Sequence, residues 1–402
     1  MSPAGPAHDL GLARLDLGDL GLDAGGHVLV ARELRRLPAG AVLHVRGRAP
    51  DLGVHLRGWC RAAGHGFAEG SDGWAVTRGL VDDARWRGAE RSAAPGGGVV
   101  ERAPSTWGLA ARGAKVEAGG PAFPFPLDRR DQVWSDSAAA IYRQAAANQW
   151  DPATAVPWDD PFVLADEVEA AVVQVMTYLV ENENAALAVP ARFLGQLHPH
   201  FREVVQALAV QVADEARHVE VFTRRAGLRG LEPGLSTAGG QASLLTLLEE
   251  PDYAVAHFLL SVLGEGTFLP LLAFIEAHGP DPVTRRVAHL ALADEGRHVA
   301  FGMAHLSDVL VADPGLRFRL ATAIRRRHDA LADTAGLNAD VFDSLVVLAA
   351  GSWSPEAVAR GYSAVADLQE EMAAGRRRRL VKLGFDAADA AELSALHTRN
   401  FM

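Results

Sequence analysis

The stretch ADEARHVEVF at residues 213–222 returns as ADEGRHVAFG at residues 293–302, and little else in the chain is repeated. Both copies lie in apolar surroundings with helical spacing, VVQALAVQVADEARHVEVF and RRVAHLALADEGRHVAFGMAHL. Acidic, basic and imidazole side chains cost free energy in such a setting unless something pairs them. The repeat is therefore the starting point for both fold and function.

Each copy contains a Glu-x-x-His pair, Glu215 with His218 and Glu295 with His298. Residues three apart lie on the same face of a helix, so each pair can direct a carboxylate and an imidazole at one metal ion. A di-metal carboxylate site in a helical bundle uses two such pairs and one further Glu from each of two other helices. The repeat thus predicts two more ligands, one before each pair.

Two glutamates meet this requirement. Glu183 lies 32 residues before Glu215, and Glu265 lies 30 residues before Glu295, each at the distance of one helix, a turn and the return. Both are embedded in apolar stretches, VVQVMTYLVENENAAL and HFLLSVLGEGTFLPLL, where an isolated carboxylate would be costly. The nearly equal spacing of the two halves favours a metal site over a chance match.

Two further glutamates, Glu181 and Glu276, lie near these positions. Glu183 continues the apolar stripe of its helix in phase, whereas Glu181 falls on the other face with Gln174, Tyr178 and Asn184. Glu276 lies beyond the apolar run that contains Glu265 and at the wrong distance from the second motif. We therefore expect Glu183 and Glu265 as ligands. The stripe that leads to Glu183 consists of Val172, Val175, Met176 and Leu179.

The Asp and Arg inside each motif have an expected role in an outer layer of the site. Metal-bound imidazoles usually donate their second N–H to a carboxylate or carbonyl. Asp214 and Asp294 are placed to accept such bonds, each from the His of the opposite half, and Arg217 and Arg297 would hold these aspartates. Four carboxylates and two neutral imidazoles carry a charge of −4, which two divalent ions would balance.

On these motifs, residues 160 to 306 resemble the ferritin-like di-iron carboxylate superfamily, in particular its oxygen-activating branch. Glu183 with NAALAVPARF, then ADEARH, Glu265 and ADEGRH, is similar to the hydroxylase subunits of bacterial multicomponent monooxygenases. Arylamine N-oxygenases and acyl-carrier desaturases share the ligand plan. The resemblance implies two iron ions, with manganese as an alternative at one position, and O2 as co-substrate.

The sequence departs from individual subfamilies at three places. Phe222 stands where the radical Tyr of ribonucleotide reductase subunits follows the first motif His, and Ala291 stands where arylamine N-oxygenases carry an extra His. Leu269 occupies the position of a monooxygenase Thr, and Thr267 lies off that face. The subfamily and the substrate therefore stay open.

The remaining histidines and aromatic residues near the motifs are expected to have structural roles. His289 and His305 are out of phase with the second motif, and His198 and His200 sit in a turn, so we expect none of them at the metal. Packing roles are expected for the remaining aromatic residues, some of which could wall a substrate cavity: Tyr178, Tyr253, Phe222, Phe258, Phe268 and Phe301.

Residues 10–80 predict a small α/β domain with the order βαβαββ, ending in a hairpin that turns at Ser71-Asp72-Gly73. Over this length the phrases ARELRRLPAGAVLHVRG and WCRAAGHGF resemble TusA-type sulfur-carrier proteins. That family's sulfur-bearing Cys would fall near GLDAGG at 21–26, where there is none, and Cys60 is expected to be a small core residue. We expect a degenerate domain that serves as a scaffold or docking unit.

The rest of the chain divides into a linker and a helical domain. Residues 81–135 are rich in Gly and Pro and are expected to be a linker, held against a surface by Trp107 and the Phe-Pro run at 123–126. Residues 136–402 predict a ferritin-like helical bundle with extra helices from about 315, and no strand is expected after residue 110. The fold class is therefore mainly α, preceded by the small α/β domain.

Composition and charge restrict the partners, the cysteine chemistry and the cellular location that we expect. The formal net charge of −11 and the lack of a long basic stripe argue against nucleic-acid and anionic-membrane partners. One cysteine permits neither a disulfide framework nor a thiolate metal cluster within the chain. With no basic-apolar leader and no long uninterrupted apolar run, we expect a cytoplasmic location and no membrane association.

The function expected from these features is that of an O2-dependent non-haem di-iron oxygenase or oxidase, acting on a small organic substrate by hydroxylation, N-oxygenation or desaturation. Such an enzyme would need an electron donor, a reductase or ferredoxin, and its substrate could be carrier-bound. A homodimer is a further expectation. Two alternatives remain: a ferroxidase or manganese catalase-like protein, and a non-catalytic binding protein stabilised by metal.

Overall fold

The computed structural model describes residues 13–80, 86–331 and 339–398. The chain forms two compact units: the first runs to Ser92 and includes Gly113–Gly120, and the second comprises Ala93–Arg112 and the chain from Pro121 onward. The range 81–135, predicted to be a linker, is thus shared between both units, and its residues 81–85 lie outside the described residues. Each unit is described by itself.

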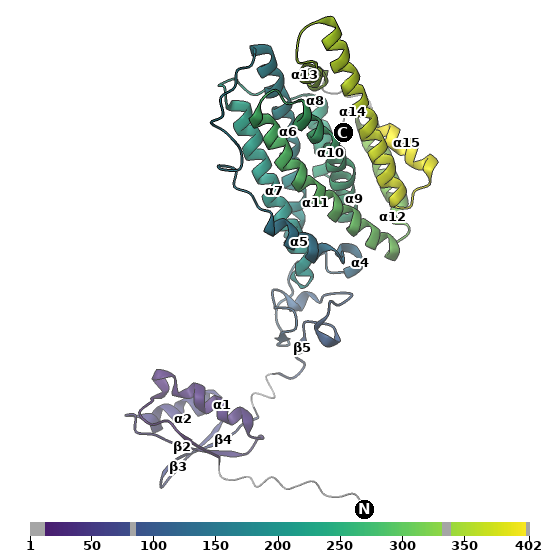
Figure 1. Cartoon of the computed structure of the whole chain (residues 1–402). Helices are drawn as coiled ribbons and strands as arrows, with labels where there is room; N and C mark the ends of the chain where they lie inside the picture. Colours follow the sequence, from purple (N-terminus) through teal and green to yellow (C-terminus); the bar gives the residue numbers. More distant parts are fainter. Residues whose placement is uncertain (1–12, 81–85, 332–338, 399–402) are drawn as a thin grey trace, which may run out of the picture. The chain divides into compact units, whose positions relative to one another are not determined.

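The first unit contains a four-stranded sheet with two helices (Figure 1, purple). Strand β1 pairs parallel with β2, and β2, β4 and β3 follow antiparallel, so the predicted order βαβαββ and the hairpin turn after Gly70 are confirmed. Leu43 and Val45 of β2 point into the core, as the strand period of two requires. The bounds are β1 (Ala13–Asp16), α1 (His27–Arg36), β2 (Val42–Arg46), α2 (Leu52–Ala62), β3 (Gly66–Gly70) and β4 (Gly73–Thr77).

Cys60 lies in α2 with none of its surface exposed, packed in the core of this unit. Burial raises the pKa of its thiol to about 11 and so disfavours the thiolate that sulfur transfer requires. The GLDAGG stretch forms a single π-helical turn, η1 (Leu22–Gly26), before α1. The burial of Cys60 and the raised pKa of its thiol agree with a core role for this cysteine.

Residues 86–135 contain little regular structure. Two-residue strands β5 (Glu90–Arg91) and β6 (Lys115–Val116) pair antiparallel. The expectation of no strand after residue 110 was therefore wrong; two residues are too few to show a periodicity in sequence. As expected, Trp107 is buried within the second unit, with its ring 5.4 Å from that of His200.

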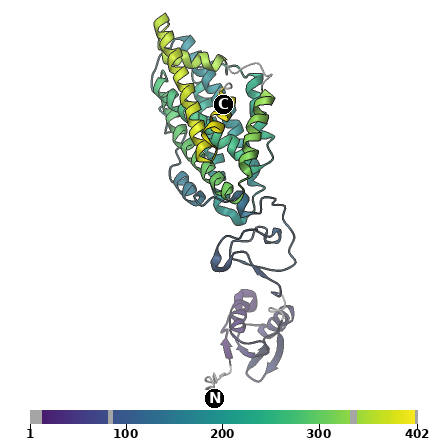
Figure 2. The ribbon, with the colours of Figure 1, turned by 90° about the vertical axis from the view of Figure 1, so that its right-hand side faces the viewer.

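The second unit is built on four long helices (Figures 1 and 2). Helix α6 (Asp166–Leu194) turns back into α7 (Arg202–Gly227), and a long connection containing α8 (Ala238–Leu248) leads to the second pair. In that pair, α9 (Tyr253–His257), the π-helical η5 (Phe258–Glu265) and α10 (Gly266–His278) run continuously and return through α11 (Pro282–Ala312). Two antiparallel pairs with one long crossover are the ferritin-like bundle plan.

Helix-capping residues set the starts of α9 and α11, the first and last helices of the second pair. Asp252 caps α9 by accepting from the backbone N–H of Ala254 at 2.9 Å, and Asp281 caps α11 by accepting from that of Thr284 at 2.8 Å. Pro282 occupies the first turn of α11, where its missing N–H costs nothing.

A buried ion cluster fastens one end of the bundle. Arg225 near the end of α7 donates to Glu169 of α6 at 2.7 and 3.0 Å, to Asp281 at 2.8 Å and to Thr284 at 2.8 Å. The arginine and both carboxylates are almost entirely buried. One residue thus ties together the ends of three bundle helices.

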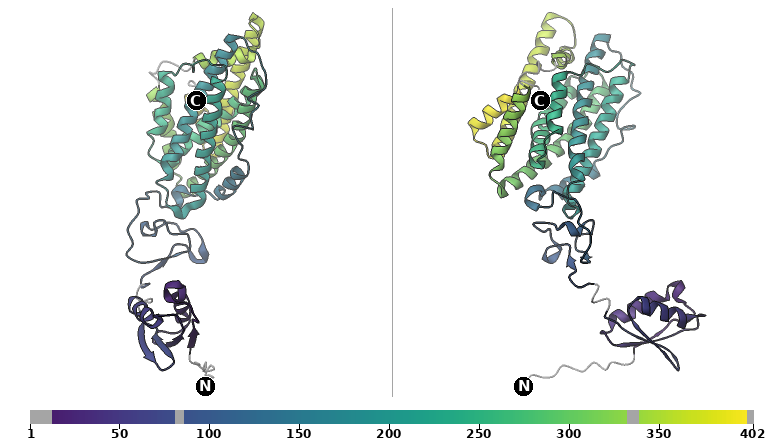
Figure 3. Two further views of the ribbon diagram at one scale, coloured as in Figure 1. Left: turned by 90° about the vertical axis from the view of Figure 1, so that its left-hand side faces the viewer. Right: turned by 180° about the vertical axis from the view of Figure 1, so that it is seen from behind.

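Four further helices follow the bundle: α12 (Leu316–Leu331), α13 (Ala339–Ala350), α14 (Pro355–Lys382) and α15 (Ala387–Thr398). Helices α14 and α15 run along its outside, yellow-green to yellow in Figure 3, with α14 against α10. The extra helices predicted from about 315 are therefore confirmed. Earlier in the chain, the short helices α4 (Arg130–Val133) and α5 (Ala138–Ala147) lie against α11 and α7 respectively.

Among the residues that the structure describes, one helical stretch, Tyr253–His278, is long and apolar enough to cross a membrane by length and composition. The sequence prediction overlooked it because polar residues interrupt its apolar run. In the structure 78% of that window is buried within the protein, as is typical of a core helix.

Candidate metal centre

All six predicted ligands meet at the centre of the bundle. Glu183 comes from α6, Glu215 and His218 from α7, Glu265 from the end of η5, and Glu295 and His298 from α11. None of the six is more than 4% exposed. The i, i+3 spacing in α7 and α11 places each imidazole beside its own glutamate, as the helical geometry predicts.

The ligand atoms form two overlapping groups, each within 4.8 Å. One group contains Glu183, Glu215, His218 and Glu295, and the other contains Glu215, Glu265, Glu295 and His298. Glu215 and Glu295 belong to both, so each can bridge two ions. The arrangement has the number and type of ligands that two metal ions require, with carboxylate oxygens and imidazole nitrogens that suit iron or manganese.

Unpartnered buried atoms test whether metal ions fit here. Glu183 Oε1 and Glu265 Oε2 make no hydrogen bond among the described residues, and His298 Nδ1 faces only carboxylate oxygens, Glu215 Oε1 at 3.0 Å and Glu295 Oε2 at 3.4 Å. Buried polar atoms are almost always satisfied, so a cluster of exceptions in one place indicates missing partners. Four carboxylates and two neutral imidazoles also leave a charge of −4 that two divalent cations would balance.

Each ligand histidine is oriented from the opposite half of the site. His218 Nε2 lies 3.2 Å from Asp294 Oδ2, and His298 Nε2 lies 3.2 Å from Asp214 Oδ2. In a neutral imidazole these bonds favour the proton on Nε2, and they direct Nδ1 toward the carboxylates; Nδ1 of His218 is 3.0 Å from Glu215 Oε2. This is the crossed arrangement expected from the sequence.

The two arginines of the motifs close the outer layer. Arg217 and Arg297 each donate to the aspartate of their own motif and lie 3.4 and 3.7 Å from that of the other. The two aspartates and two arginines sum to zero charge, so this layer positions the imidazoles and leaves the negative charge of the centre unchanged.

Three residues that the sequence analysis missed also belong to this layer. Gln149 donates to Asp214 Oδ1 at 3.0 Å, and Trp150 Nε1 donates to Asp294 Oδ2 at 2.8 Å. Gln211 donates to Glu265 Oε1 at 2.9 Å. Gln211 sits one turn before Glu215 on the same face of α7 and could have been found by phase, whereas Gln149 and Trp150 precede the bundle and carry no periodic signal.

The segment that presents Glu265 is π-helical over eight residues. A π turn inserts an extra residue per turn and so shifts the face on which later side chains lie; such turns are frequent at functional sites. The expectation of a regular helix missed this feature, because π turns have no simple sequence period.

Burial and neighbouring charges raise the pKa values of three of the ligands. Burial, together with the neighbouring carboxylate of Glu215, raises the pKa of Glu183 well above its ordinary value. Burial opposes a charged His218, but the charge of Glu183 and hydrogen bonds to Asp294, Glu183 and Glu215 together outweigh it and raise the imidazole pKa well above its ordinary value. Burial likewise raises the pKa of Glu265 strongly. Without metal the centre therefore holds protons that bound cations must displace.

The rival residues lie elsewhere. Glu181 is half-buried and joins neither ligand group, and Glu276 forms an exposed pair with His289 at 2.9 Å. His198 and His200 contact the backbone of residues 100–104.

His305 is buried and pairs with His257, which the sequence analysis did not consider, at 2.9 Å between their Nδ1 atoms. Tyr178, for which a packing role was expected, is buried and stacks on Phe268.

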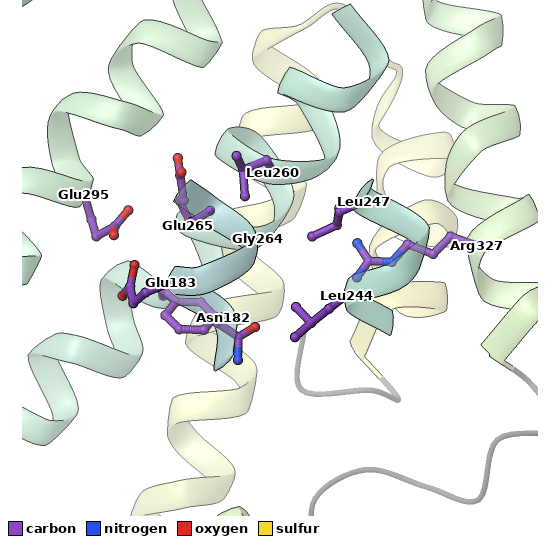
Figure 4. A pocket seen from close by; sticks show the side chains of 11 residues that line it. Asn182, Glu183, Leu244, Leu247, Leu260, Gly264, Glu265, Glu295 and Arg327 are labelled. Atoms are coloured by element: carbon purple, nitrogen blue, oxygen red, sulfur yellow. The ribbon is translucent and has the colours of Figure 1, made fainter. Parts of the chain in front are cut away.

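A largely apolar cavity opens beside the centre (Figure 4). The empty space between its lining atoms, including the part open to solvent, is about 400 Å³, and three ligand carboxylates, Glu183, Glu265 and Glu295, form part of its wall. The rest of its lining is Asn182, Ala186, Leu244, Leu247, Leu260, Gly264, Phe268 and Arg327. Of the four expected core phenylalanines, Phe268 thus walls a cavity.

Known proteins similar to this chain are found among solved structures. No protein-family model matches the sequence, and no curated protein matches it. Among solved structures, an R2-like ligand-binding oxidase with an aerobically reconstituted Mn/Fe cofactor is similar at 18% identity, over 67% of this chain and 95% of that chain, with a TM-score of 0.42. A variant with an Fe/Fe cofactor gives 20% identity, 62% and 94% coverage and a TM-score of 0.46. These values are too low to establish a family, so the functional argument rests on the residues.

Proposed function

We propose that the protein is an O2-dependent oxidoreductase with two metal ions, iron at both positions or manganese at one, that acts on a small organic substrate. The observation that carries this proposal is the apolar cavity whose wall includes Glu183, Glu265 and Glu295. A substrate in that cavity would lie directly beside the metal ligands. A mostly apolar lining with a few polar groups is typical of small-molecule sites.

The residues of the site would each have a definite task. Glu215 and Glu295, which belong to both ligand groups, would serve both metal positions, and His218 and His298 would offer Nδ1 to the metal while Asp294 and Asp214 hold their Nε2–H. When bound, the two reduced metal ions supply the electrons for O2 reduction. The leucines of the cavity exclude water, which favours reaction with an organic C–H or N–H bond over release of reduced oxygen.

Hydroxylation illustrates the electron balance: R–H, O2, two electrons and two protons give R–OH and water. Two Fe(II) ions supply two electrons once, so repeated turnover needs an external donor, a reductase or ferredoxin.

We further propose that the N-terminal α/β domain docks such a partner or a carrier of the substrate, and that the protein is a homodimer.

The two alternatives place different demands on the site. Iron handling and peroxide disposal move small polar species and make no use of a leucine-lined cavity. A purely structural metal site needs no such space beside its ligands.

Phe222 is fully buried, with its ring 6.2 Å from that of His218. It stands where the radical-bearing subunits of ribonucleotide reductase carry a Tyr, so this position has no hydroxyl group here.

Single-turnover oxygen consumption tests the proposal. Protein loaded anaerobically with Fe(II) should consume about one O2 per pair of ions and release little H2O2 in the presence of a bound organic substrate. Release of stoichiometric H2O2 regardless of added organic compound would instead identify a ferroxidase. Absence of any oxygen consumption by fully loaded protein would leave the non-catalytic alternative.

A further inference from the structure

The cavity has a cation at the end away from the metal ligands. Arg327 of α12 is only 6% exposed, and its guanidinium group points into the cavity from the side opposite Glu183, Glu265 and Glu295 (Figure 4). Leu244, Leu247 and Leu260 lie between the two ends.

Arg327 lacks the counter-charge that buried arginines normally have. Its Nη2 donates to Ser243 Oγ at 2.6 Å and to Ser243 O at 3.4 Å, and its Nε has no partner. Among the described residues no carboxylate pairs with it. The adjacent arginines of α12 are paired, Arg325 with Glu392 at 2.9 Å and Arg326 with Glu250.

The protein nevertheless keeps this side chain charged at neutral pH. Burial lowers the pKa of Arg327 only to about 10. A buried unpaired cation is costly, and removing the counter-ion of a buried pair is strongly destabilising. Because this guanidinium faces the cavity, the missing counter-charge fits a ligand that enters it.

We propose that Arg327 binds the carboxylate of an organic acid whose apolar skeleton lies along the leucines and points at the metal centre. That this acid is the substrate rests on the proposed function. The planar guanidinium fork matches a carboxylate with two parallel hydrogen bonds. One guanidinium balances one negative charge, whereas a phosphate dianion would leave an excess charge among leucines and beside an acidic centre.

Octanoate and 1-octanol are suitable probes, because they share a chain and differ in the head group. Binding is measured by calorimetry on anaerobic metal-loaded protein for wild type, Arg327→Met, Arg327→Lys and, as matched control, Arg325→Met. Arg327→Met should weaken octanoate binding by about 10- to 100-fold. It should leave 1-octanol binding and the melting temperature unchanged or raised. Arg327→Lys should fall between wild type and Arg327→Met, and Arg325→Met should match wild type.

Three results would overturn the inference. Unchanged octanoate affinity in Arg327→Met, with loss of binding on metal removal, would place the carboxylate at the metals. Loss of octanol binding together with a lowered melting temperature would show that Arg327 is structural. Tighter Arg327-dependent binding of octyl phosphate than of octanoate would refute the carboxylate. Arg327-dependent octanoate binding in protein that consumes no O2 would support this site and count against the proposed function alone.

Discussion

Replacing Asp294 by Asn should weaken metal binding without unfolding the protein. Asp294 accepts hydrogen bonds from His218 Nε2 at 3.2 Å, from Trp150 Nε1 at 2.8 Å, and from Arg297 and Arg217. Asn has the same shape but only one accepting oxygen, so its NH2 group must face one of these donors. The imidazole of His218 loses its fixed orientation in consequence.

The size of the effect follows from charge and hydrogen bonding together. The outer layer changes from zero to +1, next to two cations, and one donor is left unsatisfied. Losses of this kind typically reduce metal affinity about 10- to 100-fold, or about 1.4 to 2.7 kcal/mol. We therefore expect the Fe(II) dissociation constant to rise by that factor.

The assay is an anaerobic Fe(II) titration against a competing chelator. Asp343→Asn, which changes an exposed carboxylate on α13, is the matched control and should bind like wild type. Wild-type affinity in Asp294→Asn would refute the role given to the crossed Asp–His bonds, because a solvated aspartate changes little when it becomes Asn.

Three further predictions concern stability and protons. Arg225→Met leaves Glu169 and Asp281 buried without their cation and should cost about 3–5 kcal/mol in urea unfolding, whereas the exposed Arg229→Met should cost almost nothing. Burial lowers the pKa of His305 from 6.5 to about 4, so as pH falls the unfolded chain takes up this proton first. His305 therefore lowers stability by about 3 kcal/mol between pH 6.5 and 4, and His305→Gln should flatten that part of the profile in metal-free protein. Because the metal-free centre holds protons, Fe(II) addition in weak buffer should release them and its affinity should rise with pH; a titration without proton release would contradict the raised ligand pKa values.

The candidate ligand set was predictable because helical geometry fixes the spacing of residues that share one face of a helix. Glu215 and His218 must be three apart to share a face, and Glu183 must lie one helix and a turn earlier. The crossed aspartates followed from the chemistry of metal-bound imidazole. The buried positions of the six ligand candidates and of Asp214 and Asp294 could thus be anticipated from spacing and charge.

Other parts of the site depend on packing that has no sequence period. Trp150 reaches Asp294 from a segment before the bundle, and Arg327 reaches the cavity from α12, a helix outside the ligand repeat. The sequence of the π-helical segment that ends at Glu265 cannot be distinguished from that of an ordinary apolar α-helix. His257 and His305 are 48 residues apart, and only tertiary contact brings them together.

Anaerobic Fe(II) binding to the purified protein tests the central claim most directly. Four buried carboxylates and two imidazoles in two groups that share Glu215 and Glu295 should bind about two Fe(II) per chain, and Glu215→Ala should lose binding at both positions because it serves both. A stoichiometry near zero for wild type, or two ions still bound by Glu215→Ala with wild-type affinity, would show that these residues do not form a di-metal centre.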